Sequence, residues 1–125
     1  MPTTTAGRNA MVQGLVGALT PLFNNANAHL GVGNSATAFS AAQTDLVGAS
    51  KTRKAMDATY PTVATNVITA VSTFGTADAN HAWDEVGFFN GATANTMFSR
   101  VVVALGTKTS ASTFVLTYTH TTTLV

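Results

Sequence analysis

Histidine and acidic side chains are the first candidates for chemistry in this chain, because they bind metals and transfer protons. The 125 residues include three histidines, His29, His81 and His120, and no cysteine. Only His81 has acids at a suggestive spacing, with Asp78 on one side and Asp84 on the other. A hydrated histidine beside two loop acids is a far more common arrangement than a metal site. We therefore predict no metal centre and no cofactor.

Paired acids and activated nucleophiles are the next candidates. Asp84 and Glu85 are adjacent, so on a strand their side chains point to opposite faces and cannot act on one atom. The sequence has no Gly-x-Ser-x-Gly elbow that would expose a nucleophilic serine. The run 31–34 lacks the third glycine and the Lys-Ser/Thr pair of phosphate-binding loops. These patterns predict that the protein is not an enzyme.

The single glutamate, Glu85, lies in an apolar stretch where an unpaired acid would be costly to bury. Residues 91–96 are rich in Gly, Ala, Thr and Asn, and they would fold the segment 83–100 back on itself as a β-hairpin. Arg100 or Arg53 then becomes a partner for the acid. We predict a structural Glu–Arg ion pair that pins the hairpin.

The run Lys51-Thr52-Arg53-Lys54 is the one cluster of charge in the sequence. If it is a strand, Lys51 and Arg53 share one face, and Thr52 and Lys54 share the other. Lys51, Arg53 and Lys54 could contact an acidic partner surface or a phosphate. They could equally protect an edge strand from aggregation. Both interpretations remain open from the sequence.

Charged residues make up 9% of the chain, with a formal net charge of +1, whereas about 25% is average for globular proteins. This balance does not favour binding to nucleic acid or to an anionic membrane. Threonine (23 residues) and alanine (21) replace the charges. Because so few charges protect poorly against association, the composition favours a structural protein in a permanent assembly. We expect no signal peptide and no membrane-spanning stretch.

The spacing of apolar residues divides the chain into an N-terminal arm with a short helix, 1–25, and a β domain, 26–125. Residues 1–8 form an extended tail in this prediction, and Asn9 caps a helix over 10–19. Short alternating segments between turns then predict an antiparallel β-sandwich. The expected strands are 28–33, 51–58, 66–74, 82–90, 97–105 and 112–121.

Large apolar side chains mark the expected core. The predicted core residues are Trp83, Phe88, Phe98, Phe114 and Leu116. In the last strand Tyr118 shares a face with the final two of these. His120, near the end of that strand, is expected at the surface.

Five blocks of the sequence, in consistent order over residues 28–121, resemble bacteriophage virion proteins. The blocks are Leu-Gly-Val-Gly-Asn at 30–34, Ala-Ala-Gln-Thr-Asp-Leu at 41–46, the basic run at 51–54, Trp-Asp-Glu-Val-Gly-Phe-Phe-Asn at 83–90 and Met-Phe-Ser-Arg at 97–100. They are similar to the N-terminal module of phage tail-collar and tail-fibre proteins and to small free-standing virion proteins. The resemblance implies a β-rich module that attaches to a virion and is a homo-oligomer, often a trimer.

Phage fibres continue into a long shaft, for which a chain ending at Val125 has no room. We therefore expect a capsid decoration protein, made in the bacterial cytoplasm and located on the virion, that binds the major capsid protein and stabilises the shell. One alternative is a tail-fibre, collar or neck module that binds tail or neck proteins and serves host attachment. Another is a small carbohydrate-binding β-sandwich with Trp83, Tyr60 or Tyr118 as stacking platforms.

Overall fold

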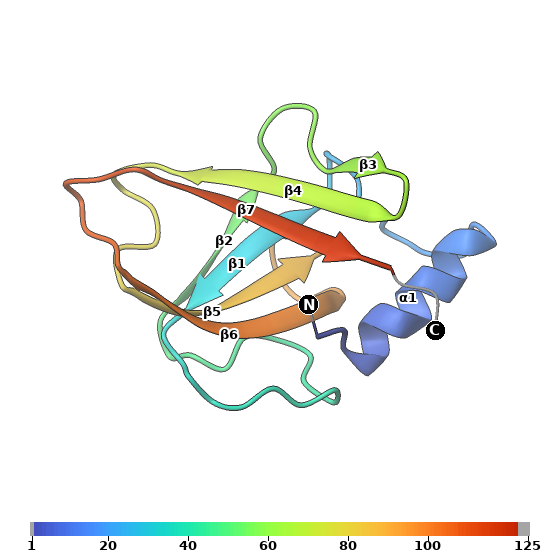
Figure 1. The fold of residues 1–125 in the computed structure, drawn as a ribbon, viewed down its shortest axis with the longest axis horizontal. Coiled ribbons are helices and arrows are strands. Elements are labelled where there is room, and N and C mark those ends of the chain that lie inside the picture. Colours follow the sequence, from blue (N-terminus) through green and yellow to red (C-terminus); the bar gives the residue numbers. More distant parts are fainter. Residues whose placement is uncertain (1, 123–125) are drawn as a thin grey trace.

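A computed structural model describes residues 2–122, which form seven β-strands and one N-terminal α-helix (Figure 1). The mainly β class predicted from the sequence is confirmed. The elements are α1 (Thr5–Leu15), β1 (His29–Gly33), β2 (Lys51–Ala55), β3 (Thr62–Ala64), β4 (Val67–Phe74), β5 (Ala82–Phe89), β6 (Met97–Thr107) and β7 (Phe114–Thr121).

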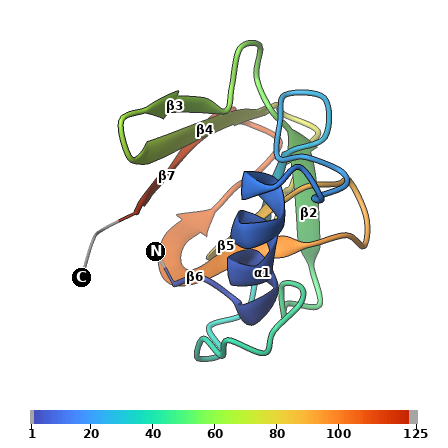
Figure 2. The ribbon, with the colours of Figure 1, turned by 90° about the vertical axis from the view of Figure 1, so that its right-hand side faces the viewer.

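The strands form two antiparallel sheets, with the orders β2-β1-β5-β6 and β3-β4-β7. The two sheets lie in layers, with β4 and β7 over β1 and β5, and α1 lies at one end of both layers (Figures 1 and 2). This is the sandwich that the short alternating strands predicted. The hairpin of β5 and β6 is present, with irregular pairing opposite Asp84 and near Phe89.

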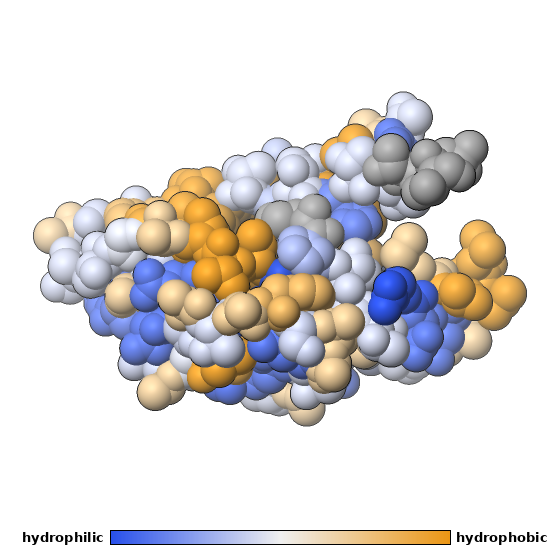
Figure 3. Space-filling model, turned by 60° about the horizontal axis from the view of Figure 1, so that its bottom comes forward, coloured by the Kyte–Doolittle hydropathy of each residue, from blue (hydrophilic) through white to orange (hydrophobic). Residues whose placement is uncertain are grey.

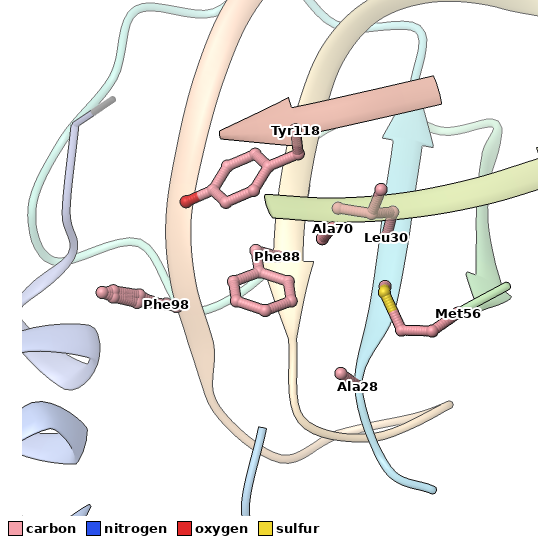
Figure 4. Close-up of a cluster of buried hydrophobic side chains, with 7 residues drawn as sticks. All are labelled: Ala28, Leu30, Met56, Ala70, Phe88, Phe98 and Tyr118. Atoms are coloured by element: carbon pink, nitrogen blue, oxygen red, sulfur yellow. The ribbon is translucent and has the colours of Figure 1, made fainter. Parts of the chain in front are cut away.

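The inner faces of the two sheets enclose two apolar clusters. One surrounds Phe88, with Leu30 from β1 and Tyr118 from β7 packed against it (Figure 4). The other surrounds Trp83, whose ring meets that of Phe74 edge-on at a centroid distance of 4.8 Å. Aromatic side chains from both sheets therefore hold the layers together.

Three of the predicted core residues, Trp83, Phe88 and Phe98, are buried. The other two, Phe114 and Leu116, are half-buried and pack against the core clusters from β7. On β7, exposed residues alternate with buried or half-buried ones along the whole strand. His120 is an inward-facing residue of this pattern and is buried against the ring of Phe98, so the prediction that it lies at the surface is wrong.

Leu46, Phe89 and Met97 form a smaller apolar cluster. On β5, Phe89 points to the face opposite that of Phe88, because successive side chains of a strand alternate between faces. Leu46 belongs to the long connection 34–50 between β1 and β2, which carries no strand or helix. That connection therefore covers the outer face of the four-stranded sheet.

The helix was predicted in the right region but at the wrong bounds. It begins at Thr5 and ends at Leu15, rather than spanning 10–19 behind an Asn9 cap, so residues 5–8 are helical and not part of an extended tail. Thr4 is the N-cap, and its hydroxyl accepts the N–H of Gly7 at 2.9 Å. At 11 residues, α1 is too short to cross a membrane.

The cap is placed by contacts with β6. The Thr4 hydroxyl donates to the carbonyl of Met97 at 2.6 Å, and the Thr4 N–H donates to the carbonyl of Phe98 at 3.0 Å. A Cβ atom on Gly7 would lie 2.1 Å from the same Phe98 oxygen. The first turn of α1 is thus pressed directly onto the backbone of the sheet.

The six predicted strands all form, within a few residues of their expected bounds. β3 was not predicted, because its three exposed residues have no alternating pattern of their own. It forms by pairing with β4, opposite Val67, Ile68 and Thr69. β6 extends to Thr107, two residues beyond the predicted end.

Candidate interaction surface

Glu85, from the outward side of β5, is fully buried. Its carboxylate accepts hydrogen bonds from the backbone N–H groups of Val47 at 2.7 Å, Gly48 at 2.9 Å and Ser35 at 3.1 Å. Arg100 of β6 donates from Nε to the same carboxylate at 3.2 Å. The predicted Glu–Arg pair is present, and in addition it fastens both ends of the connection 34–50 to the sheet.

Arg100 is also fully buried. Its Nη1 donates to the side-chain oxygen of Gln43 at 3.2 Å, while Nη2 has no hydrogen-bond partner among residues 2–122. A buried pair of this kind contributes little net stability compared with an apolar pair, but removing one member leaves the other charge uncompensated. The pair therefore has a structural role and no substrate-accessible surface.

Arg53, the alternative partner predicted for Glu85, has other contacts. Its guanidinium lies over the ring of Phe89 at 3.6 Å and donates to the carbonyls of Gly91 at 3.0 Å and Ala94 at 2.8 Å. It also forms an ion pair with Asp45 at 3.1 Å. Arg53 thus ties the hairpin loop 91–96 to the connection 34–50.

The two lysines of the basic run are also paired within the chain. Lys51 donates to Asp45 at 2.9 Å, and Lys54 donates to Asp78 at 2.9 Å. Burial alone would raise the pKa of Asp45, but hydrogen bonds from Lys51, a backbone N–H and Arg53 outweigh it and hold that pKa below its usual range. The hydrogen bond from Lys54 lowers the pKa of Asp78 in the same way.

As β2 is an edge strand with Lys51 and Lys54 side chains still about 40% exposed, the structure favours the interpretation of the basic run as edge protection. A cavity of about 240 Å³ lies beside Arg53, between Asp45 and the hairpin loop. The charged groups around it are satisfied by one another. Among the described residues that line it, none carries an unpaired charge that would select an anionic ligand.

The histidines do not assemble a metal site. His81 contacts Thr52 at 3.2 Å through Nε2 and the carbonyl of Ala82 at 2.8 Å through Nδ1. Asp78, which the sequence placed near His81, is bonded to Lys54 instead. Across residues 2–122, no group of three histidine, aspartate or glutamate side chains could hold a metal ion.

The predicted stacking platforms for carbohydrate are mostly inaccessible. Trp83 and Tyr118 are 2% and 1% exposed, so neither can stack on a sugar. Burial raises the pKa of Tyr118 to about 12, although a hydrogen bond with Ser99 opposes the rise. Tyr60 is half-buried against the core. The prediction of Trp83 and Tyr118 as platforms is wrong, because the sandwich needs both rings in its interior.

The outer side of α1 is the clearest surface feature. Leu15 lies four residues after Met11 and three after Val12, so its side chain lies beside both of theirs on the helix surface. Met11, Val12 and Leu15 are 43%, 66% and 88% exposed. Val16, directly after the helix, is 75% exposed. Figure 3 shows hydrophobic residues gathered at the projecting end of the helix, on the right. The buried side of α1 carries the small residues Gly7 and Ala10 instead.

An apolar groove of about 180 Å³ runs beside this helix. Its walls are Ala10, Met11 and Gly14 of α1, and its floor includes Phe98 and His120. Burial lowers the pKa of His120, so the neutral ring suits an apolar floor. The groove and the exposed helix face together form a continuous apolar region, which we call the α1 surface.

The sequence signals for this surface were weak. The spacing of the apolar residues predicted a helix over 10–19, but it did not show which side of that helix would be exposed. Only the position of Gly7 against β6 shows which side of the helix faces the sandwich. Comparison with known proteins adds no relative: no family model, no curated protein and no solved structure matches this chain.

Proposed function

We propose that this protein is a non-enzymatic structural protein of a bacteriophage virion, a capsid decoration protein that binds the outside of the shell and stabilises it. The five sequence blocks that resemble phage virion proteins support the phage assignment. The low charge of the chain supports a protein whose surface is covered in an assembly.

The observation that carries the proposal is the exposed apolar face of α1. A surface helix of a monomer ordinarily buries its large apolar residues and exposes polar ones. Here Gly7 and Ala10 are buried, while Val12, Leu15 and, directly after the helix, Val16 are exposed next to the polar residues of the helix. Complete burial of each exposed side chain in a partner surface contributes about 1.5–3 kcal/mol. The α1 surface thus supplies both an anchor and the driving force for binding a shell subunit.

The polar chemistry of the chain is consistent with this role. Glu85, Arg100, Arg53, Lys51 and Lys54 all bond within the chain and serve to hold its loops. The proposed contact is therefore apolar rather than ionic. The basic run 51–54, for which the sequence allowed either a partner contact or edge protection, contributes little to the contact with the shell.

Copy number on purified particles tests the proposal directly. A decoration protein is present in a number that scales with the subunits of the shell. A tail-fibre, collar or neck module would instead occur in a few copies at one vertex. Absence of the protein from particles would overturn both assignments.

Substitution tests the α1 surface itself. Leu15→Asp places a charge on the exposed helix face, and we expect binding to particles to weaken by about tenfold or more. Val63→Asp is the matched control, because Val63 is 73% exposed on β3, outside the helix. Both variants should keep the thermal stability of the wild type. Equal particle binding by the two variants would contradict the role of α1.

A further inference from the structure

Within the described residues, the two sheets end in four edge strands, and three of these edges are protected against pairing with another chain. β2 carries Lys51, Arg53 and Lys54. β3 is three residues long and follows Pro61. β6 is bulged opposite Asp84, and residues 2–4 lie along its first part through a bridge between Thr3 and Ser99.

The fourth edge, β7, has none of these features. Its eight residues pair with β4 in an unbroken register, from Phe114 opposite Phe74 to Thr121 opposite Val67. The strand Phe-Val-Leu-Thr-Tyr-Thr-His-Thr contains no proline, lysine, arginine or acid. Its one titratable group near neutrality, His120, is turned inward and buried. β7 is therefore a long, regular and uncharged edge.

The hydrogen-bond pattern shows which backbone groups of β7 face outward. Thr122 donates to the carbonyl of Asn66 at 2.9 Å, so even-numbered residues of β7 bond to β4. On β4, Val71 and Thr73 bond to Asp57 on the opposite side, which is consistent with this alternation. The groups left facing outward are the N–H and C=O of the odd-numbered residues. These are Val115, Thr117, Thr119 and Thr121.

A row of unpaired N–H and C=O groups on a straight strand is recognised by another extended strand. We propose that the occupant is β7 of a second copy of this chain, paired antiparallel about a twofold axis. The result is one continuous six-stranded sheet through both subunits, in the order β3-β4-β7-β7-β4-β3.

One pairing register gives hydrogen-bond partners to the outward N–H and C=O groups of all four odd-numbered residues. With Tyr118 on the twofold axis, Thr117 pairs with Thr119 of the partner subunit, and Val115 pairs with Thr121 of the partner subunit. The side chains of these residues are exposed and uncharged, so self-pairing brings no like charges together, and Thr–Thr pairs across strands are favourable. A twofold contact of this kind is self-complementary and closes at two subunits. This differs from the trimer implied by the phage resemblance.

The flank of the sandwich beside β7 provides additional apolar area. Val115 is 63% exposed, and on β6, an edge strand of the other sheet, Val102, Val103 and Leu105 are each about 40% exposed. β6 and β7 meet through the hydrogen bond between Ser99 and Tyr118. Burial of these side chains between subunits would add to the strand pairing.

The mass of the purified protein in solution tests the dimer without reference to particles, so its outcome is independent of the proposed function. Sedimentation equilibrium should give twice the 12.8 kDa mass of one chain. Thr117→Lys/Thr119→Lys places two charges on the β7 edge and should give a single-chain mass with unchanged thermal stability. Thr62→Lys/Ala64→Lys adds the same charges to β3 and should remain dimeric.

Hydrogen exchange on the wild type supplies a second measurement that needs no variant. In the dimer, the amides of Val115, Thr117, Thr119 and Thr121 should exchange as slowly as their even-numbered neighbours. A single-chain or trimer mass for the wild type at high concentration would overturn the proposal. So would fast exchange at these four amides in a protein of dimer mass, or a dimer that survives the two β7 lysines.

Discussion

Glu85 shows how a single side chain can organise a loop. Its carboxylate collects the N–H groups of Ser35, Val47 and Gly48, which lie at the two ends of the connection 34–50. Small residues lie beside it: a Cβ atom on Gly48 would lie 2.6 Å from a backbone nitrogen and does not fit without a shift, and one on Gly33 would lie 3.0 Å from the Glu85 side chain, a tight contact. The acid and the small residues around it form one unit.

Replacing Glu85 with glutamine should destabilise the fold strongly. The amide nitrogen of glutamine would face backbone N–H donors, and Arg100 would remain buried without its counter-charge. We expect a loss of about 3 kcal/mol in the free energy of unfolding, measured by urea denaturation. Asp84→Asn, at the half-buried neighbouring acid, should change it by less than about 0.5 kcal/mol. Equal effects of the two substitutions would show that the buried pair is not what holds the loop.

At the level of elements, α1 depends on its close approach to β6. Gly7 touches the backbone of Phe98, whereas Gly14 faces open space apart from a Leu19 side-chain atom 3.8 Å from where a Cβ would lie. Glycine within a helix is otherwise unfavourable compared with alanine. Close packing on β6 therefore requires glycine at position 7, whereas nothing near position 14 prevents a larger residue there.

Alanine substitutions at these two glycines should change stability in opposite directions. Gly7→Ala forces the helix away from β6 and should cost about 1–3 kcal/mol of unfolding free energy. Gly14→Ala should be neutral or add up to about 1 kcal/mol, because it improves helix propensity without a clash. Thermal and urea unfolding of the two variants measure this difference. A similar result for both would contradict the close packing of α1 on β6.

The strands could be predicted because alternation along a half-buried sheet is a local pattern, as on β7. The Glu85–Arg100 pair could also be predicted, since a buried acid needs a cation and the hairpin brings this one near. The helix start could not, because the Thr4 cap is fixed by Met97, 93 residues away in sequence. The partners of Arg53 were missed for the same reason: they lie on two loops that only the folded chain brings together.

For the whole molecule, the distribution of charge is the main feature. Five of the six basic side chains bond within the chain, and among them Arg100 and Lys108 are buried. On α1, the large exposed side chains Met11, Val12 and Leu15 are apolar, and the exposed polar residues of the helix are Thr5, Arg8, Asn9 and Gln13. Long-range attraction to a partner is therefore weak, and the surfaces left for association work by burying apolar groups and by strand pairing.

This distribution predicts how binding to particles responds to salt. Raising the salt concentration from about 0.1 M to about 1 M shortens the screening length from about 10 Å to about 3 Å. An apolar contact through α1 should keep its occupancy on purified particles, or gain slightly, over this range, measured by quantifying bound protein after sedimentation. A contact through the basic run should lose most of its occupancy.

The variant Lys51→Ala/Lys54→Ala distinguishes the α1 contact from a contact through the basic run. Binding to particles should persist in this variant. Loss of binding, together with a steep salt dependence in the wild type, would place the contact on β2 instead of α1.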